Sequence, residues 1–427
     1  MRALYSALAW AAQPLLRRKL RRRAAAEPGY AQAVEERFGR YTQPAGSGYV
    51  WIHAVSLGET RAAAILLAAL RRELPGMRLL LTHGTATGRA EGAKLLQPGD
   101  VQVWQPWDTP GAVRRFLRQF SPAIGILMET EVWPNLAAQC RRQGIALVLA
   151  NARLNAKSLR NAQRLGWLAR PAYRALAAVW AQTEADAQRL RALGAPVQGV
   201  FGNLKFDVVP DAAQAGRGRA WRAGLPRPVV MLASSREGEE AMWLEVLKQK
   251  WPPTQAGSAQ AAINSEVRWL IVPRHPQRFG EVYQLLLDAG LAVSRRSTWA
   301  QTPDAEADVW LGDSLGEMAL YYGLADVALL GGSFAPLGGQ NLIEAAACGC
   351  PVVLGPHTFN FAEAAELACA AGAAERVPGL AQGVERACAL AADGPRLAQA
   401  RAAAAAFAQA HRGAADATAR AVARLVT

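Results

Sequence analysis

Three carboxylic acids in the first half of the chain directly follow predicted strands, where they could act as acids or bases. Glu59 lies in WIHAVSLGET, between an apolar run and a helix expected from Thr60. Glu129 and Glu131 follow another apolar run, in LMETEVWPN. A carboxylate in such a turn can take a proton from a hydroxyl as a general base. Glu59 could equally cap its helix, because acids are stabilised near helix N-termini.

The two acids after the second run have their own alternatives. If that strand continued past Met128, Glu129 and Glu131 would project to the same side, because only one residue separates them. Two acids at a strand end are costly unless they are solvated, paired or functional, so one is expected to orient an acceptor or assist Glu59. Glu131 could instead belong to the start of a helix ahead of Pro134.

A glycine-rich stretch in the second half, residues 326–361, predicts a nucleotide site. A strand ends in a glycine pair, and Gly338 and Gly339 then precede a helix that Asn341 opens and that carries Glu344. Glycines let the backbone approach a ligand closely, and the amides of a helix N-terminus attract phosphate. Glu344 could accept hydrogen bonds from ribose hydroxyls. The alternative is an ordinary strand–helix–strand crossover whose glycines allow tight packing.

Other polar side chains also follow predicted strands, where anions could bind. They are Arg153 in NARLNAKS, Lys205 in GNLKFD, Ser234 and Ser235 in ASSREGEE, and Arg274 and His275 in PRHP. Each could be ordinary surface polarity. Their position after strands, rather than on helix faces, favours a role in ligand binding.

Apolar runs and helical stretches alternate along the whole chain, which is typical of α/β domains with parallel sheets. Strands are expected at residues 49–55, 78–82, 101–104, 123–128, 145–150, 179–182 and 197–201, and again at 229–233, 269–272, 309–311, 327–330 and 352–354. The pattern predicts two Rossmann-like domains facing across a cleft, at residues 24–205 and 206–427. A polar surface insertion is expected at residues 252–265.

The first 23 residues form a separate segment that predicts contact with a membrane. A mostly apolar stretch of residues 3–16 leads directly into six lysines and arginines within residues 17–23. A membrane-spanning helix needs about 20 apolar residues, so this stretch is too short. We expect a helix in the cytoplasmic leaflet with its cations on anionic headgroups. A short tilted anchor and a helix packed on the domain are the alternatives.

Charge is distributed unevenly over the chain. The net charge is +14, and residues 1–205 hold 29 lysines and arginines against 12 acids, so the second half is nearly neutral. A basic first half favours an anionic surface as partner, although arginine-rich composition alone could contribute. The five cysteines have no metal-ligand spacing and fit a reducing cytoplasm.

Taken together, these segments resemble the 3-deoxy-D-manno-octulosonic acid (Kdo) transferases of lipopolysaccharide synthesis. The matching segments, in order, are HAVSLGE, METEVWPN, NARLNAKS, GNLKFD, SSREGEE, PRHPQRF, GDSLGEM and GGSFAPLGGQNLIEAAACGCPVVLGPHTFNF. The resemblance implies a two-domain glycosyltransferase of the GT-B type. It further implies transfer of Kdo, with inversion, from CMP-Kdo to the tetraacylated lipid A precursor (lipid IVA) at the cytoplasmic side of the inner membrane.

The resemblance also assigns roles to residues. The family's catalytic base matches Glu59, and its second essential acid matches Glu129 or Glu131. The family's CMP site matches Arg274, Ser333, Asn341 and Glu344, while Lys205 and Arg153 would join Arg274 around the donor's phosphate and carboxylate. No metal is expected, since the chain has no Asp-x-Asp motif. Two residues depart from the family pattern, because Gln340 and Arg236 stand where histidine is common.

Two other functions would share some of these features. A GT-B enzyme that uses a UDP-sugar, such as the muramyl-lipid N-acetylglucosaminyl transferase, would share the glycine-rich turn and Glu344, but not HAVSLGE, GNLKFD and PRHPQRF. A basic, non-catalytic binder of membranes or nucleic acid would not need acids such as Glu59 near a ligand site. We therefore expect an enzyme that has no nucleic-acid partner.

Overall fold

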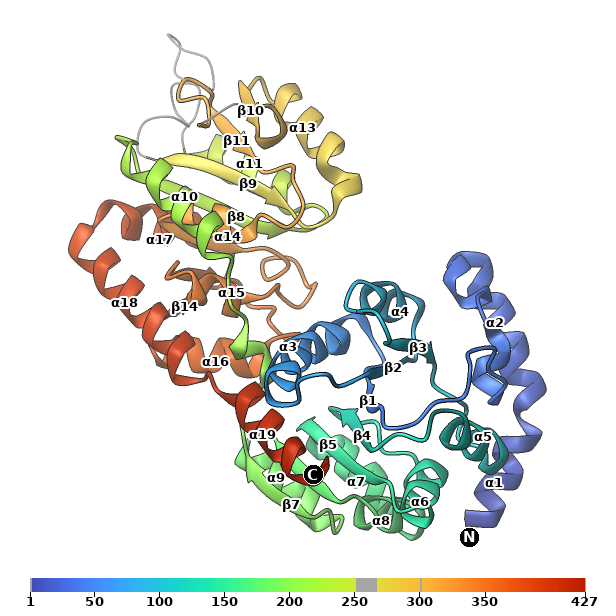
Figure 1. Ribbon diagram of the computed structural model, residues 1–427. Helices are drawn as coiled ribbons and strands as arrows, with labels where there is room; N and C mark the ends of the chain where they lie inside the picture. The colour runs from blue at the N-terminus through green and yellow to red at the C-terminus, as the bar shows by residue number, and fades with distance from the viewer. Residues whose placement is uncertain (1, 251–266, 300–301, 427) are drawn as a thin grey trace. The chain divides into compact units, whose positions relative to one another are not determined.

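The computed structural model describes residues 2–250, 267–299 and 302–426, and the chain divides into two compact units (Figure 1). The first unit comprises residues up to Asp207 together with the C-terminal segment from His411, and the second comprises Val208–Ala410. The first division, between Asp207 and Val208, lies two residues after the expected boundary between residues 205 and 206. The predicted insertion at residues 252–265 lies outside the described residues.

The first unit is built on a parallel sheet of seven strands. The strands are β1 (Val50–His53), β2 (Leu79–His83), β3 (Val101–Trp104), β4 (Ile124–Met128), β5 (Ala146–Ala152), β6 (Ala178–Ala181) and β7 (Val197–Val200). Their order is β3-β2-β1-β4-β5-β6-β7. Strand order reverses between β1 and β4, which is where open α/β sheets bind ligands at the carboxyl ends of their strands. Glu59 follows β1 and Glu129 follows β4.

Helices cover both faces of this sheet, so its strands are apolar along most of their length. The covering helices are α3 (Leu57–Glu73), α4 (Ala86–Ala93), α5 (Pro110–Phe120), α6 (Pro134–Arg142), α7 (Ala156–Arg164), α8 (Gly166–Arg174), α9 (Glu184–Ala192) and α19 (Ala414–Val426). The unit also contains α1 (Arg2–Ala11) and α2 (Gln13–Ala26), which contribute to neither sheet core, and short 3-10 turns η1 (Pro28–Ala31), η2 (Val34–Phe38) and η3 (Leu204–Asp207). One core contains Trp51 and Phe116, and the core on the other face contains Leu66 and Trp180.

The position of α19 corrects the expected domain boundary, which assigned residues 206–427 to the second domain. Ala419 and Val422 of α19 are fully buried in the core that also contains Leu66 and Leu70 of α3. Asp207 fixes the return of the chain, because its carboxylate accepts hydrogen bonds from the amides of Gly413 and Ala415 (2.5 and 2.6 Å). The last helix therefore belongs to the first unit.

The second unit repeats the architecture with another parallel sheet of seven strands. They are β8 (Val229–Ser235), β9 (Arg268–Pro273), β10 (Val293–Arg295), β11 (Val309–Leu311), β12 (Val327–Leu330), β13 (Val352–Leu354) and β14 (Ala374–Arg376), in the order β10-β11-β9-β8-β12-β13-β14. The order reverses between β8 and β12, and the glycine-rich stretch begins directly after β12. The short edge strands β10 and β14 were not predicted.

The helices of the second unit lie on both faces of its sheet (Figure 1). They are α10 (Ala212–Ala223), α11 (Glu239–Lys250), α13 (Phe279–Asp288), α14 (Met318–Leu324), α15 (Leu342–Ala347), α16 (Ala362–Ala370), α17 (Leu380–Ala392) and α18 (Gly394–Ala410), with 3-10 turns η4 (Pro276–Arg278) and η5 (Arg296–Thr298). The buried core of this unit contains Trp243, Trp269, Val282 and Leu329. The α/β architecture with two Rossmann-like sheets is as predicted.

The N-terminal segment forms two helices that meet at Ala12. Pro14 lies in the first turn of α2, where proline is tolerated because the early amides of a helix have no partner in the helix. In the described part of the chain, no helix is long and apolar enough to cross a membrane.

Candidate active site

Glu59 belongs to the first turn of α3, where it makes a capping arrangement with Ser56. The Ser56 hydroxyl accepts from the Glu59 amide (3.4 Å) and donates to Glu59 Oε1 (3.0 Å). The amide of Val55 donates to Glu59 Oε2 (2.8 Å). This is a variant of the Ser-x-x-Glu capping box. Glu59 therefore has the capping role that the sequence allowed, and its carboxylate is held in a fixed orientation beside the end of β1.

The environment of Glu59 raises its pKa to about 7. Burial is the main cause, and the negative charges of Glu129 and Glu131 add to it, while the hydrogen bonds from Val55 and Ser56 oppose it. A general base works best when its pKa lies near the operating pH. A carboxylic acid with this pKa can accept a proton at neutral pH and give it up again.

Glu129 does not continue strand β4, which corrects the expectation that Glu129 and Glu131 project together. The strand ends at Met128, and Glu129 has a left-handed backbone with φ of 57°. The Glu129 amide bonds to the carbonyl of Ala150 (3.0 Å), which keeps the turn against β5. Such a backbone is uncommon outside glycine and clusters at functional sites.

The side chains of the two acids have different partners. Glu129 is only 6% exposed and forms an ion pair with Arg153 (2.8 Å). Glu131 accepts a hydrogen bond from the indole of Trp133 (3.0 Å), and burial raises its pKa. Arg153, which we expected near a donor anion, is thus already engaged by Glu129 across the ends of β4 and β5.

The glycine-rich stretch of the second unit has the conformation that its sequence suggested. Gly338 and Gly339 have φ of 89° and 73°, in the region that side chains disfavour. A side chain at Gly338 would also collide with Asn360. Asn341 caps α15, its side-chain oxygen accepting from the amide of Ile343 (3.1 Å). Glu344, half-buried, lies in the first turn of this helix.

A buried acid that the sequence analysis did not select holds this stretch in place. Glu239 is fully buried, and its carboxylate accepts hydrogen bonds from the amides of Arg236 (2.9 Å), Gly332 (2.7 Å), Phe334 (3.2 Å) and Ala335 (3.2 Å). It therefore joins the turn after β8 to the turn after β12. The available signal in the sequence was the pair of acids, Glu239 and Glu240, at the start of α11.

Two serines expected to contact a ligand use their hydroxyls inside the protein instead. Ser235 is fully buried and donates to Glu240 (2.6 Å), which in turn pairs with Arg278 (2.9 Å). Ser333 is also fully buried, donates to the carbonyl of Leu330 (2.5 Å) and accepts from the amide of Gly355 (2.8 Å). These hydroxyls shape the two turns and do not face solvent.

Gln340, the departure from the family pattern inside the glycine-rich stretch, has a clear partner. Its side-chain oxygen accepts a hydrogen bond from Nε of Arg274 (3.0 Å), so it connects the turn after β9 to the glycine-rich stretch. The amide of Arg274 also bonds to the carbonyl of Ser235 (2.9 Å). Gln340 therefore orients the guanidinium that we expect to meet the donor's phosphate.

The remaining predicted site residues are Ser234 and His275 in the second unit and Lys205 in the first. Ser234 follows the regular part of β8 with φ of 54°, and its side chain is half-buried. His275 is half-buried, and burial together with the charges of Arg236 and Arg274 lowers its pKa. Lys205 lies in η3 of the first unit, where its amide bonds to the side chain of Asn203 (3.1 Å).

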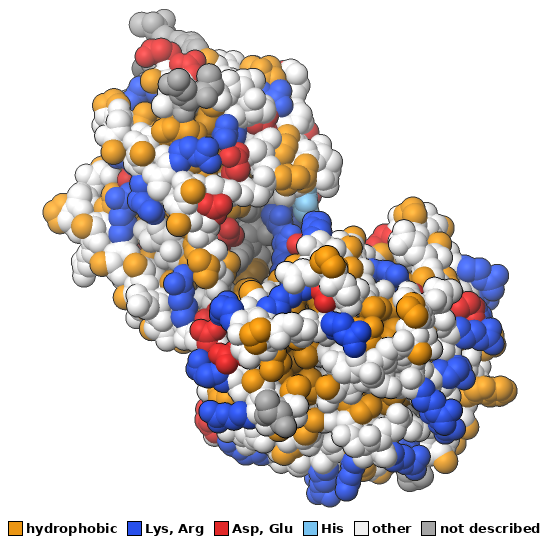
Figure 2. Space-filling model, in the orientation of Figure 1, with side chains coloured by type: hydrophobic (Ala, Val, Ile, Leu, Met, Phe, Trp, Pro, Cys, Tyr) orange, Lys and Arg blue, Asp and Glu red, His pale blue; other side chains and the backbone are white. Residues whose placement is uncertain are grey.

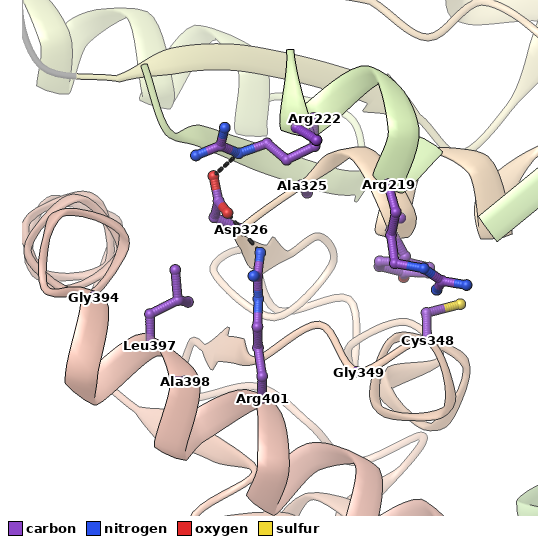
Figure 3. Close-up of a pocket in the computed structure, with 13 residues that line it drawn as sticks. Arg219, Arg222, Ala325, Asp326, Cys348, Gly349, Gly394, Leu397, Ala398 and Arg401 are labelled. Atoms are coloured by element: carbon purple, nitrogen blue, oxygen red, sulfur yellow. Dashed lines mark hydrogen bonds and ion pairs between the residues drawn. The ribbon is translucent and has the colours of Figure 1, made fainter. Parts of the chain in front are cut away.

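A cavity of about 760 Å³ in the second unit lies at the amino ends of the strands, opposite the ends that carry the predicted ligand residues (Figure 3). Its lining includes Asp326, just before β12, and Gly349, just before β13, so it opens at the amino ends of these strands. Asp326 is bracketed by Arg222 and Arg401, each at 2.5 Å. This cavity is separate from the strand ends that carry the predicted ligand residues.

The two-sheet fold is that of known glycosyltransferases. A crystal structure of a glycosyltransferase from Rickettsia africae matches with a TM-score of 0.54 at 12% identity, covering 89% of this chain and 98% of that one. Likeness at this identity defines the fold class.

Sequence comparison then defines the family. Residues 32–208 match the family described as 3-deoxy-D-manno-octulosonic-acid transferase (kdotransferase). A 3-deoxy-D-manno-octulosonic acid transferase of Bordetella pertussis is 52% identical over 319 residues, 74% of this chain and 72% of the relative. One from Haemophilus influenzae is 32% identical over 372 residues, 85% of this chain and 84% of the relative. The chain belongs to the Kdo transferase family and is a glycosyltransferase.

Proposed function

We propose that this chain transfers Kdo from CMP-Kdo to lipid IVA, with inversion and with Glu59 as general base. The observation that carries the proposal is Glu59 itself, a carboxylate with a pKa of about 7 at the carboxyl end of β1. It lies where strand order reverses, the usual ligand position in such sheets. Membership of the Kdo transferase family supports Kdo as the transferred sugar. The resemblance to that family is the basis for CMP-Kdo as donor and lipid IVA as acceptor.

The proposed step is one displacement at the anomeric carbon of Kdo. A hydroxyl of lipid IVA gives its proton to Glu59, and its oxygen forms the new bond to that carbon. The bond from the same carbon to the phosphate oxygen of CMP breaks, and CMP leaves with the electron pair. Attack and departure on opposite faces invert the configuration.

The leaving CMP needs positive charge and a fixed position rather than further activation. In the proposal, Arg274 meets the phosphate, and the amides at the start of α15 and the carboxylate of Glu344 meet the nucleotide. The Arg274–Gln340 hydrogen bond of 3.0 Å supports this role, because it holds the guanidinium at the glycine-rich stretch. No metal enters the proposed step, since cationic side chains take its place.

The second essential acid is best matched by Glu129. It is almost fully buried in a 2.8 Å ion pair with Arg153, and its negative charge helps to raise the pKa of Glu59. Glu131 adds a smaller share of the same repulsion. The pKa of Glu59, about 7, suits proton transfer near neutral pH.

The N-terminal helices are the proposed contact with the cytoplasmic face of the inner membrane. Leu4, Leu8, Trp10 and Leu15 expose their side chains, and Arg18, Lys19, Arg21 and Arg22 are exposed along α2. Figure 2 shows lysine and arginine side chains gathered over the first unit. Exposed apolar groups beside a row of cations fit an interface rich in anionic lipid. The helices also pack on the domain, since Leu20 is buried and Arg17 lies 3.8 Å over the ring of Phe38.

The experiment that tests the proposal is incubation of the purified protein with CMP-Kdo and lipid IVA in vesicles. We expect release of CMP together with a lipid product heavier by whole Kdo units, detected by mass spectrometry. A parallel binding series with CMP and UDP separates this function from that of a UDP-sugar transferase. Preference for UDP, or binding of vesicles without any CMP release, would contradict the proposal.

A further inference from the structure

Helix α1 is attached to the first unit by polar side chains rather than by an apolar seam. None of its residues is buried. Leu4, Leu8 and Trp10 are exposed, whereas Tyr5 and Ser6 are half-buried where the helix meets the domain. A surface helix that packs on a globular domain usually buries its apolar stripe against the core. In α1 the large apolar side chains are left free, and the contact with the domain is made by two hydroxyl groups.

Both hydroxyl groups bond to residues at the start of helix α6 (Figure 1). The Ser6 hydroxyl donates to Oδ1 of Asn135 (3.0 Å). Nδ2 of Asn135 donates to the carbonyl of Asp108 (2.7 Å), which leaves Oδ1 as the acceptor for Ser6. The Tyr5 hydroxyl donates to the Asp108 carboxylate, which also accepts from the amides of Asn135 (2.9 Å) and Leu136 (2.8 Å). The first turn of α6 is therefore tied directly to α1.

The start of α6 also belongs to the turn that presents two acids of the candidate active site. Glu129 and Glu131 lie between strand β4 and helix α6. Trp133 directly precedes the helix, and its indole donates to Glu131 (3.0 Å). Three residues separate Glu131 from Asn135. A movement of the helix start is therefore passed to Glu131, whose negative charge acts on Glu59.

The contact between α1 and α6 is weak compared with the binding of α1 to lipid. Each of the two hydrogen bonds favours the contact by about two- to tenfold, because water competes for the same groups. Burial of each exposed leucine of α1 in the apolar part of a membrane favours the buried state by more than about tenfold. Pro14 has no amide hydrogen, so the join between α1 and α2 lacks one helical hydrogen bond. Lipid contact can therefore control the position of α1.

We propose that Tyr5 and Ser6 are positioning residues that couple lipid binding by α1 to the turn carrying Glu129 and Glu131. The inference rests on the proposed function, in which α1 lies on a membrane that contains anionic lipid. Lipid binding restricts α1 to the membrane surface, which raises the effective concentration of its two hydroxyls at the start of α6. The turn is then ordered for transfer. Away from lipid, α1 leaves α6 more often and the turn loosens, so the enzyme is most active where its lipid acceptor is found.

The test measures hydrogen exchange of the amides in residues 129–136, with and without vesicles made of equal parts phosphatidylcholine and phosphatidylglycerol. The double variant Tyr5→Phe/Ser6→Ala removes both hydroxyls and keeps the exposed apolar side chains of α1. The matched control, Tyr30→Phe, removes a tyrosine hydroxyl of the same N-terminal region that accepts from Arg23 of α2 (3.3 Å). Cosedimentation measures vesicle binding by each protein, and unfolding midpoints confirm that each is folded.

We expect vesicles to slow exchange of residues 129–136 by about five- to fiftyfold in the wild type and in the control, which is the combined effect of two hydrogen bonds. In the double variant, vesicles should leave the exchange unchanged although the protein binds them as the wild type does. Equal slowing in the double variant, no slowing in the wild type, or a wild type that does not bind vesicles would each overturn the coupling.

Transfer kinetics separate positioning from recruitment to the membrane. With CMP-Kdo and lipid IVA in the same vesicles, the double variant should lower kcat by about five- to tenfold and leave KM for lipid IVA unchanged, because its membrane contact is intact. A rise in KM at an unchanged kcat would overturn the positioning role. Hydrogen exchange needs no substrate, so it still decides the coupling if the wild type transfers no Kdo, a result that would contradict the proposed function alone.

Discussion

The amide of Val55 donates a 2.8 Å hydrogen bond to Oε2 of Glu59, so the residue after strand β1 fixes the acid in the first turn of helix α3. The same carboxylate accepts from the Ser56 hydroxyl at 3.0 Å. One side chain therefore caps a helix and presents an ionisable group at the strand end. The two roles are compatible because a carboxylate has lone pairs beyond those that its two donors use.

The pH dependence of transfer should follow the ionisation of Glu59. The base must be deprotonated, so kcat/KM is expected to rise about tenfold per pH unit up to about pH 7 and then level off. In Glu131→Gln the rising limb should move to lower pH, because removing a neighbouring negative charge lowers the pKa of Glu59. A pH–rate profile of the two proteins checks this. An identical limb in both would show that another group controls the rate.

The free energy of unfolding should fall as Glu59 ionises, over the pH range in which kcat/KM rises. The pKa of Glu59 is raised in the folded protein, so the folded state binds the proton more tightly than the unfolded state. The contribution of Glu59 to stability is therefore present below about pH 4.5 and is lost as pH rises towards about 7. Glu59→Gln should show a smaller fall in unfolding free energy over this interval than the wild type, measured by urea denaturation. Parallel curves would contradict the raised pKa.

The ion pair between Glu129 and Arg153 should act as a unit in catalysis. We expect Glu129→Gln and Arg153→Gln each to lower kcat/KM by about tenfold or more, and the double variant to lose little more than either single one. The exposed pair of Glu184 and Arg191 (2.9 Å) is a suitable control, because neither residue is among the candidate site residues. Additive losses in the double variant would show that the two residues work independently.

Glu239 should control nucleotide affinity through the glycine-rich stretch. In Glu239→Gln the four amides that meet the carboxylate lose part of their acceptor, so CMP binding is expected to weaken by about tenfold. Calorimetric titration with CMP measures this. The control is Glu237→Gln, an exposed acid that pairs only with Arg236 among the described ion pairs. Equal CMP affinity in both variants and the wild type would remove Glu239 from this role.

Membrane binding should depend on the exposed apolar side chains of α1 and α2 rather than on the whole segment. Replacing Leu4, Leu8, Trp10 and Leu15 with serine is expected to reduce sedimentation with vesicles of anionic phospholipid. Leu20→Ala is the matched control, since Leu20 is buried against Tyr30 and Phe38, and its loss should affect stability more than binding. Unchanged binding by the serine variant would show that these helices do not contact lipid.

The sequence predicted those features that depend on local pattern. Nearly continuous apolar runs placed most strands within a few residues, and Asn341 correctly marked the start of α15. Features set by distant contacts were missed. The apolar face of α19 does not say which unit it joins, and its position becomes clear only beside Leu66 and Leu70 of α3.

In the candidate site too, features that depend on local sequence were predicted and features that depend on distant contacts were missed. Position after a strand selected Glu59 and Arg274, because that rule depends only on neighbouring residues. The rule could not foresee that Glu129 leaves the strand with a left-handed backbone, or that Ser235 and Ser333 turn inward to bond with buried partners. Glu239 was missed because its importance lies in partners far along the chain.

The most direct test of the account compares CMP release and CMP binding in Glu59→Gln. Glutamine keeps the shape of the side chain and can still accept a hydrogen bond from Val55, but it cannot take a proton. Ser56→Ala is the control for lost capping, and it should retain most of the activity. We predict that CMP release from CMP-Kdo in the presence of lipid IVA falls by about 10²–10⁴-fold in Glu59→Gln, while CMP affinity stays at the wild-type value. Turnover near that of the wild type would contradict the assignment of Glu59 as the base.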